Sequence, residues 1–187
     1  MRKLIYSMTV SLDDFIAGPD GAIDWSVPDE ELFRFHHQQV QEIGVHLCGR
    51  RLYETMLYWE TAEESPLVAE QIEFAQTWKA LPKVVFSATL ESVVGNTRLA
   101  RDGVGEEVSR LKEQPGKDIA VGGAGLARAC MKLELIDEWR LFFSPVLLGG
   151  GTPYFPTLDE RINLELVETK TFGSRVVYLR YRVSPAR

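Results

Sequence analysis

The sequence predicts a three-layer α/β/α fold, in which helices cover both faces of a mostly parallel central sheet and antiparallel strands follow at the C-terminal end. One observation behind this prediction is that strand-like and helix-like segments alternate up to about residue 134. Another is that 163–183 contains only strand-like sequence, on either side of the turn "TFGSR". A chain of 187 residues can bury a sizeable core, so we expect one domain over 1–187.

The first elements are read from strand composition, turn residues and helix caps. Residues 3–10 are rich in β-branched and aromatic side chains, which indicates a strand. Glycine- and proline-containing turns then predict a long loop over 11–25, and such loops in compact domains are often functional. Ser26, with Asp29 three residues later, is expected to cap a helix that ends near Ile43.

The remaining elements continue the alternation. Apolar runs and amphipathic spacing predict, in order, a buried strand at 44–48, a helix from Gly49, a helical stretch at 62–80, strands at 83–89 and 97–100 (the second at an edge), a helix at 104–113, a strand at 118–122, a helix at 125–134 and a strand at 137–144. The last of these is expected to be antiparallel, like the strands of 163–183.

Composition excludes several classes of protein. A net charge of −6 argues against a nucleic-acid or anionic-membrane partner, for which a basic face is expected. No apolar run reaches the ~20 residues of a membrane helix, and the N-terminus lacks the pattern of a signal peptide. Cys48 and Cys130 stand in apolar segments, so we expect buried free thiols and a cytoplasmic location. The three histidines show no metal-ligand spacing, and no metal is expected.

Three predicted strands end in segments that suit a phosphate. They are Gly49-Arg50-Arg51, Ser87-Ala88-Thr89 and Gly122-Gly123. In open α/β sheets, ligands bind at the carboxyl ends of the strands, where helix N-termini present free N–H groups. Each turn taken alone is more often a plain connection between a strand and a helix. Three such turns in one sheet, with two arginines at one of them, favour a nucleotide site.

Five stretches, taken in order, resemble the dihydrofolate reductase superfamily. They are "SLDDFIAG", "LCGRRLYE", "VVFSAT", "VGGAGL" and "LIDEWRLFFSPVLLGGGTPYF". The last is the most specific. It is similar to the reductase domain of bifunctional riboflavin-biosynthesis deaminase/reductases and its stand-alone relatives, and the likeness covers nearly the whole chain.

This resemblance implies NADPH as the hydride donor, a homodimer, and a cis peptide bond between Gly122 and Gly123. It assigns cofactor binding to residues in five segments: Ile16; Gly49, Arg50, Arg51 and Leu52; Ser87, Ala88 and Thr89; Val121, Gly122, Gly123, Ala124, Gly125 and Leu126; and Thr152.

The resemblance also implies groups that contact the substrate. Glu31 matches the carboxylate with which dihydrofolate reductases contact the pterin, and Glu30 is the alternative. Leu32 and Phe35 would then line the substrate pocket, with Trp25 packing over the nicotinamide. Asp13 could contact substrate or order the loop after the first strand. Each has a plainer reading: a solvated first-turn acid for Glu31, a turn-forming residue for Asp13, and a hydrophobic staple for Trp25.

The function expected from these features is an NADPH-dependent reductase of a small pteridine- or aminopyrimidine-type heterocycle, similar to 5-amino-6-(5-phosphoribosylamino)uracil reductase. Dihydrofolate reduction is an alternative, although "ALPKVVF" offers no arginine for the folate tail. A non-catalytic NADPH-binding protein is the other alternative. Glu31 inside the pocket would favour an enzyme, and a pocket without polar groups would favour a binding protein.

Overall fold

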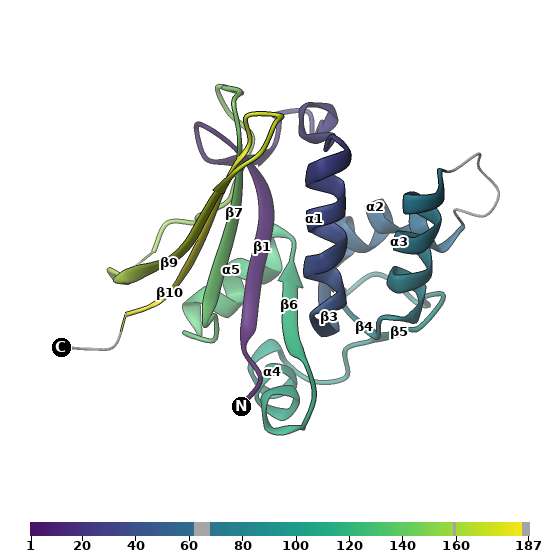
Figure 1. Cartoon of the computed structure of the whole chain (residues 1–187). Helices are drawn as coiled ribbons and strands as arrows, with labels where there is room; N and C mark the ends of the chain where they lie inside the picture. The colour runs from purple at the N-terminus through teal and green to yellow at the C-terminus, as the bar shows by residue number, and fades with distance from the viewer. Residues whose placement is uncertain (62–67, 159, 185–187) are drawn as a thin grey trace.

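The computed structural model describes residues 1–61, 68–158 and 160–184. Within these residues, eight strands form one sheet in the order β5-β4-β3-β6-β1-β7-β10-β9 (Figure 1). Strands β2 and β8 form a separate two-stranded ribbon. The strands are β1 Leu4–Ser11, β2 Phe15–Ala17, β3 Ile43–Gly49, β4 Lys83–Phe86, β5 Thr97–Leu99, β6 Asp118–Gly122, β7 Glu138–Ser144, β8 Thr152–Pro153, β9 Leu164–Thr171 and β10 Val177–Val183.

The strand directions confirm the predicted fold class. All pairings from β5 across to β7 are parallel, and β10 pairs antiparallel with both β7 and β9. One detail of the prediction was wrong. The strand expected at 137–144 is β7, which runs parallel to β1, with Ser7 opposite Arg140, and is antiparallel only to β10. The reason is that β7 follows a helix, and a helical crossover returns the chain in the same direction.

Helices cover both faces of the sheet (Figure 1). Their bounds are α1 Glu30–Gln41, α2 Arg50–Glu60, α3 Ala69–Ala80, α4 Val104–Glu113 and α5 Ala124–Lys132, with a 3-10 turn at Asp24–Ser26. Alternate residues of β1 define the two faces, because side chains alternate along a strand. Leu4 and Tyr6 belong to the apolar cluster shared with α4 and α5, whereas Ile5 packs in the cluster shared with α1, α2 and α3.

Several boundaries differ from those predicted. The cap of α1 is Asp29, whose carboxylate accepts a hydrogen bond from the backbone N–H of Leu32 at 2.9 Å. Ser26 lies in the preceding 3-10 turn and donates its hydroxyl to the carbonyl of Ile23. An ionised aspartate accepts more strongly than a serine hydroxyl, which favours the later start. The helical stretch expected at 62–80 is α3 from residue 69, and residues 62–67 lie outside the described part of the chain.

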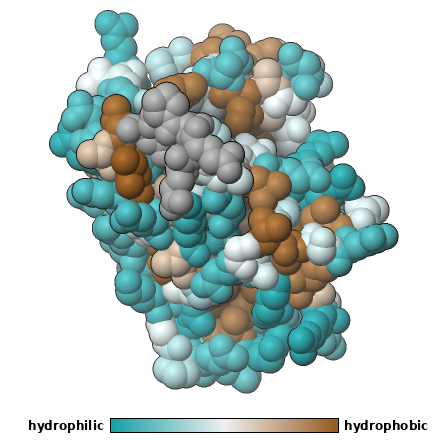
Figure 2. Space-filling view, turned by 90° about the vertical axis from the view of Figure 1, so that its right-hand side faces the viewer, coloured by the Kyte–Doolittle hydropathy of each residue, from teal (hydrophilic) through white to brown (hydrophobic). Residues whose placement is uncertain are grey.

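The outer surface of α2 and α3 mixes polar and apolar side chains. Figure 2 looks at this side of the molecule and shows hydrophobic patches separated by hydrophilic residues. Tyr58 and Ile72 are among the exposed hydrophobic residues of these two helices. Elsewhere, Cys48 and Cys130 are buried free thiols, as expected. None of the described helices is long and apolar enough to cross a membrane.

Candidate active site

The carboxyl ends of the parallel strands meet at one edge of the sheet, at the top of Figure 1. Because β4, β3, β6 and β1 are neighbours in that order, the segments that follow them also lie side by side along this edge. The turns after β3 and β6 are very close, since a Cβ atom built on Gly123 would lie 3.7 Å from the backbone nitrogen of Gly49. The structure therefore brings together the three turns that the sequence singled out.

The turn after β6 depends on glycine at Gly123, and Gly122 lies tightly against the Leu52 side chain. Gly123 has a φ angle of +93°, which residues with side chains rarely adopt, and a Cβ on Gly122 would collide with the Leu52 side chain. The expectation of a cis peptide bond here was wrong, because the bond between the two glycines is trans. Gly123 caps α5 and Gly49 caps α2 without any side-chain hydrogen bond. The first N–H groups of both helices are therefore available to an anion.

A cationic corner stands beside these turns. Arg50, the first residue of α2, donates from Nη1 to the hydroxyl of Thr89 at 2.6 Å and from Nε to the carboxylate of Glu54 at 2.7 Å. Ser87 accepts a hydrogen bond from the backbone N–H of Thr89 at 3.2 Å, which holds the segment after β4 in place. The corner offers an exposed guanidinium and two hydroxyl groups. Arg51 is also exposed, next to it in the first turn of α2.

Asp13 fastens the loop after β1 to the glycine-rich loop after β7. Its carboxylate accepts the Ser11 hydroxyl at 2.7 Å, the backbone N–H of Leu148 at 3.1 Å and that of Gly149 at 2.7 Å. These hydrogen bonds, the one from Ser11 first, lower the pKa of Asp13. Of the two roles considered for Asp13, this geometry fits the ordering of the loop. Thr152 contributes to the same region by pairing with Ala17 in the β2–β8 ribbon.

A cavity of about 290 Å³ opens from this edge and runs beneath α1, between the helix layer and the sheet. Its lining comes from four places: Ile16, Ile23 and Ser26 of the loop; Ile5, Ser7, Met8, Thr9, Ile43, His46, Ala120, Gly122, Arg140 and Phe142 of the sheet; His36, Gln39 and Val40 of α1; and Leu52, Met56, Phe74, Trp78 and Leu81 of α2, α3 and the segment after α3. Three predicted cofactor residues, Ile16, Leu52 and Gly122, line it.

Two histidines face this cavity as neutral rings. Burial lowers the pKa of His36 to about 4, and burial also lowers that of His46 to about 4. His46 Nδ1 lies 3.2 Å from the thiol of Cys48, whose pKa burial raises to about 12. At neutral pH the imidazoles can exchange hydrogen bonds with a ligand but carry no charge.

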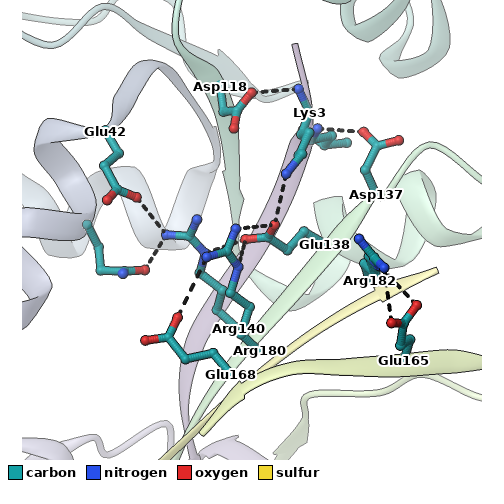
Figure 3. Close-up of polar contacts among 12 residues, drawn as sticks. Lys3, Glu42, Asp118, Asp137, Glu138, Arg140, Glu165, Glu168, Arg180 and Arg182 are labelled. Carbon is teal, nitrogen blue, oxygen red and sulfur yellow. Dashed lines mark hydrogen bonds and ion pairs between the residues drawn. The ribbon is translucent and has the colours of Figure 1, made fainter. Parts of the chain in front are cut away.

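The one arginine in the lining is held in a buried ionic network (Figure 3). Glu138, only 2% exposed, accepts from Arg140 Nε at 2.7 Å, from Arg180 at 2.9 Å and from Lys3 at 3.4 Å. Arg140 Nη1 donates further to the Gln39 side chain and to Glu42, the latter at 3.4 Å. Burial by itself would raise the pKa of Glu138, but the hydrogen bonds from the arginines lower it overall. The Arg140 charge is therefore already compensated by protein groups.

The structure places the predicted substrate-contacting residues outside the cavity lining. Glu31 accepts a hydrogen bond from the backbone N–H of Gly173 at 3.1 Å and lies 3.6 Å from the Lys170 ammonium, so its carboxylate meets the β9–β10 hairpin. Leu32 and Phe35 pack in a cluster with residues of β7, β10 and the hairpin.

The other predicted residues of this group make local contacts. Glu30 pairs with Arg34 at 2.5 Å on the exposed side of α1. Trp25 donates its indole N–H to the carbonyl of Ala22 at 3.2 Å, which matches a local packing role.

On α1 the cavity is lined by a different face from the one that carries Glu31, Leu32 and Phe35. His36, Gln39 and Val40 face the cavity and follow the i, i+3, i+4 spacing of one helix face. A second available signal was Arg140 within the apolar run "WRLFF", because a charged residue inside a buried strand needs a partner.

A sheet with this strand order, and with glycine turns beside a cavity at its carboxyl edge, defines a dihydrofolate-reductase-like α/β domain. The chain belongs to the RibD C-terminal domain family, whose model matches residues 2–178. Among its relatives is the uncharacterized protein YyaP of Bacillus subtilis (strain 168), 36% identical over 185 residues that cover 96% of this chain and 94% of YyaP. YwjB of the same organism is 32% identical over 177 residues, covering 94% of this chain and 95% of YwjB.

Solved structures share the fold. A protein from Shewanella sp. PV-4 assigned to riboflavin biosynthesis superposes with a TM-score of 0.78 at 21% identity, covering 98% of this chain and 99% of its own. A pyrimidine reductase-like protein from Corynebacterium diphtheriae gives 0.68 at 12% identity, covering 99% and 93%. The diaminohydroxyphosphoribosylaminopyrimidine deaminase/5-amino-6-(5-phosphoribosylamino)uracil reductase of Thermotoga maritima gives 0.66 at 17% identity, covering 98% of this chain and 57% of that longer protein. The family thus includes reductases.

Proposed function

We propose that this protein is an NADPH-dependent reductase that transfers a hydride to a small heterocycle of the pteridine or aminopyrimidine type. The observation that carries the proposal is that an edge suited to phosphates adjoins a mostly apolar cavity. Gly122 and Leu52 belong to both. Gly122 ends β6 at the glycine turn, Leu52 lies in the first turn of α2, and both residues line the cavity. A dinucleotide along the edge would thereby reach the cavity with its far end.

The residues at the edge fit NADPH in chemistry and in space. Arg50, Thr89 and Ser87 offer charge and hydroxyl groups to the phosphate on the adenosine ribose. The uncapped N-termini of α2 and α5 offer N–H groups to the pyrophosphate, and the glycine turn after β6 leaves the space that a side chain would fill. The predicted residues Val121, Ala124, Gly125 and Leu126 would bind through this turn and the first turn of α5, as the resemblance implies.

When bound, NADPH supplies the hydride, and the chain's own residues would orient the heterocycle and exclude water. Ser7, Thr9 and Gln39 carry hydrogen-bonding groups suited to ring carbonyl and amino groups. The described cavity lining contains no carboxylate, so we propose that a proton reaches the reduced atom from water or through the hydroxyl groups of Ser7 and Thr9.

The alternatives have less support. Dihydrofolate reduction would call for an acid facing the pterin, and Glu31 and Glu30 both point elsewhere. A non-catalytic NADPH-binding protein has no evident use for the polar side chains that face the cavity. A cytoplasmic location, expected from the two free cysteines, and a homodimer, which the resemblance implies, remain part of the proposal.

The direct test is NADPH oxidation followed by stopped-flow absorbance, against a panel of pterins, flavins and aminopyrimidine ribosyl phosphates. Accelerated oxidation with one member of the panel is the expected result. Calorimetric titration with NADPH alone supplies the independent reading. A protein that binds no NADPH at all would overturn the proposal. Tight binding without oxidation by any panel member would favour the non-catalytic alternative.

A further inference from the structure

The cavity changes character along its length. Near the carboxyl edge its walls include Ser7, Thr9, His36 and Gln39. Farther in, at the opposite end of the strands, they consist of apolar side chains and the neutral ring of His46, which lies beside Ala120 in the sheet and against Trp78. We call this part the deep chamber, lined by Ile5, Val40, Ile43, Phe74, Trp78 and Ala120.

The deep chamber is a consequence of the strand register. Ile5 stands near the start of β1, opposite Ala120 of β6, and both side chains point toward the helix layer. Ala120 is small, and the surrounding side chains of Phe74 and Trp78 from α3 do not fill the space above it. Apolar walls exposed to a cavity lose both burial and dispersion contacts, and an apolar occupant would restore them.

Among the described residues that line this cavity, each positive charge is already paired with a protein carboxylate. Among the described lining residues, Arg140 is the one that carries a charge at neutral pH, and its guanidinium is bonded to Glu138, Gln39 and Glu42. Lys83 lies near the chamber, but its ammonium is bonded to the carbonyls of Trp78 and Leu81 and pairs with Glu60 at 3.1 Å. A phosphate placed here would be a buried charge without a partner, which is strongly unfavourable.

We infer that the deep chamber binds an uncharged apolar part of the substrate, aromatic or alkyl, in place of a phosphorylated sugar. This inference rests on the proposed function, because it assigns the cavity to the substrate. The polar ring to be reduced would then lie near Ser7, Thr9 and Gln39, close to the cofactor edge. Its apolar substituent would extend between α1, α3 and the sheet. The substrate would thus differ from an aminopyrimidine ribosyl phosphate in the group attached to the ring.

The test uses two probes on the full-length protein. N-phenyl-1-naphthylamine, a neutral apolar dye, reports binding by its fluorescence, and ribose 5-phosphate is the competing polar anion. We expect the dye to bind with a one-to-one stoichiometry and ribose 5-phosphate not to displace it. Ala120→Leu fills the chamber and should weaken dye binding at least about tenfold, the equivalent of about 1.4 kcal/mol. Ala129→Leu, the same change on α5 across the sheet, should leave it unchanged.

A second variant covers the event that Ala120→Leu does not fold. Val40→Phe fills the chamber from the partly exposed face of α1 and should have the same effect on the dye. Displacement of the dye by ribose 5-phosphate would overturn the inference, and so would wild-type dye affinity in a folded Ala120→Leu or Val40→Phe protein. Calorimetric titration with NADPH separates the two proposals. Absent NADPH binding refutes the reductase, whereas the dye results decide the chamber.

Discussion

The sharpest prediction concerns Arg50 and its neighbour Glu54, because replacing their side chains should change NADPH binding in opposite directions. The Arg50 guanidinium is divided between the Thr89 hydroxyl at 2.6 Å and the Glu54 carboxylate at 2.7 Å. If this corner binds the phosphate that distinguishes NADPH from NADH, Thr89 helps to position the cation and Glu54 competes with the phosphate for it. Arg50→Ala should therefore weaken NADPH and spare NADH, while Glu54→Gln should strengthen NADPH.

The magnitudes follow from exposure. A hydrogen bond to a charged group contributes about 1.5–3 kcal/mol, and the Arg50 side chain is 49% exposed, so screening by solvent favours the lower end. About 1.5 kcal/mol corresponds to a roughly tenfold rise in the NADPH dissociation constant. The pair of Arg50 with Glu54 spans one helical turn, and such pairs contribute about 0.3–0.5 kcal/mol, so Glu54→Gln should tighten NADPH roughly twofold.

Calorimetric titration of wild type, Arg50→Ala, Glu54→Gln and Arg51→Ala with both cofactors is the assay. Arg51 is the matched control, since it is an exposed arginine in the same helical turn. The effects should shrink at high salt. Equal affinity for NADPH and NADH in the wild type would refute the role of this corner. A selective loss in Arg51→Ala alone would keep the mechanism and move it by one residue.

Four further predictions follow. Glu138→Gln should lower the free energy of unfolding by about 3–5 kcal/mol, whereas Glu165→Gln, which breaks an exposed pair, should change it by less than about 1 kcal/mol in chemical denaturation; equal effects would contradict a buried network. The pKa of Glu138 lies below its ordinary 4.5, so its ionised carboxylate contributes fully to the free energy of unfolding above that pH and loses this contribution as the pH falls further. The free energies of unfolding of wild type and Glu138→Gln should then converge in acid. Asp13→Asn should speed hydrogen exchange at the amides of Leu148 and Gly149, and unchanged rates would show that the loop is held otherwise. Glu31→Gln should leave kcat nearly unchanged, since its carboxylate meets the hairpin, and a large fall in kcat would return it to the active site.

The fold was predictable because its signals are local. Strand and helix periodicity, the turn at "TFGSR" and the glycine turns each lie within a few neighbouring residues, so the sequence carries them directly. The direction of β7 was not local. It follows from the crossover through α5, which precedes the strand, whereas the composition of β7 itself does not distinguish its parallel partner β1 from its antiparallel partner β10.

For the same reason, the sequence indicated the edge of the candidate site but not its cavity. The edge proposed to bind phosphates is made largely of backbone, so glycines at the strand ends indicate it in the sequence, and the resemblance supplied the individual residues. The cavity is made of side chains from segments far apart in the sequence. His36 and Gln39 belong to it only because α1 is rotated so that Leu32 and Phe35 face β7 and β10. That rotation is set by the aromatic cluster of Phe142, Phe172 and Tyr178, which the first helix alone does not reveal.

The buried ionic network around Glu138 links the cavity wall to the antiparallel strands of the sheet. Arg140 stands in the middle of β7, opposite Ser7 on one side and Arg180 on the other, so a charge at the cavity wall is linked to the antiparallel end of the sheet. The Arg140 guanidinium is already bonded to Glu138, Gln39 and Glu42, and the two carboxylates balance its charge. Arg140 therefore contributes shape and hydrogen bonding to the cavity, and no net charge. An anionic ligand would compete for this arginine with Glu138 and Glu42, and Glu138 is itself buried. The energetic cost of that exchange is the physical reason to expect a neutral group beneath α1, even in a family whose characterised fold relatives include an enzyme of phosphoribosylamino substrates.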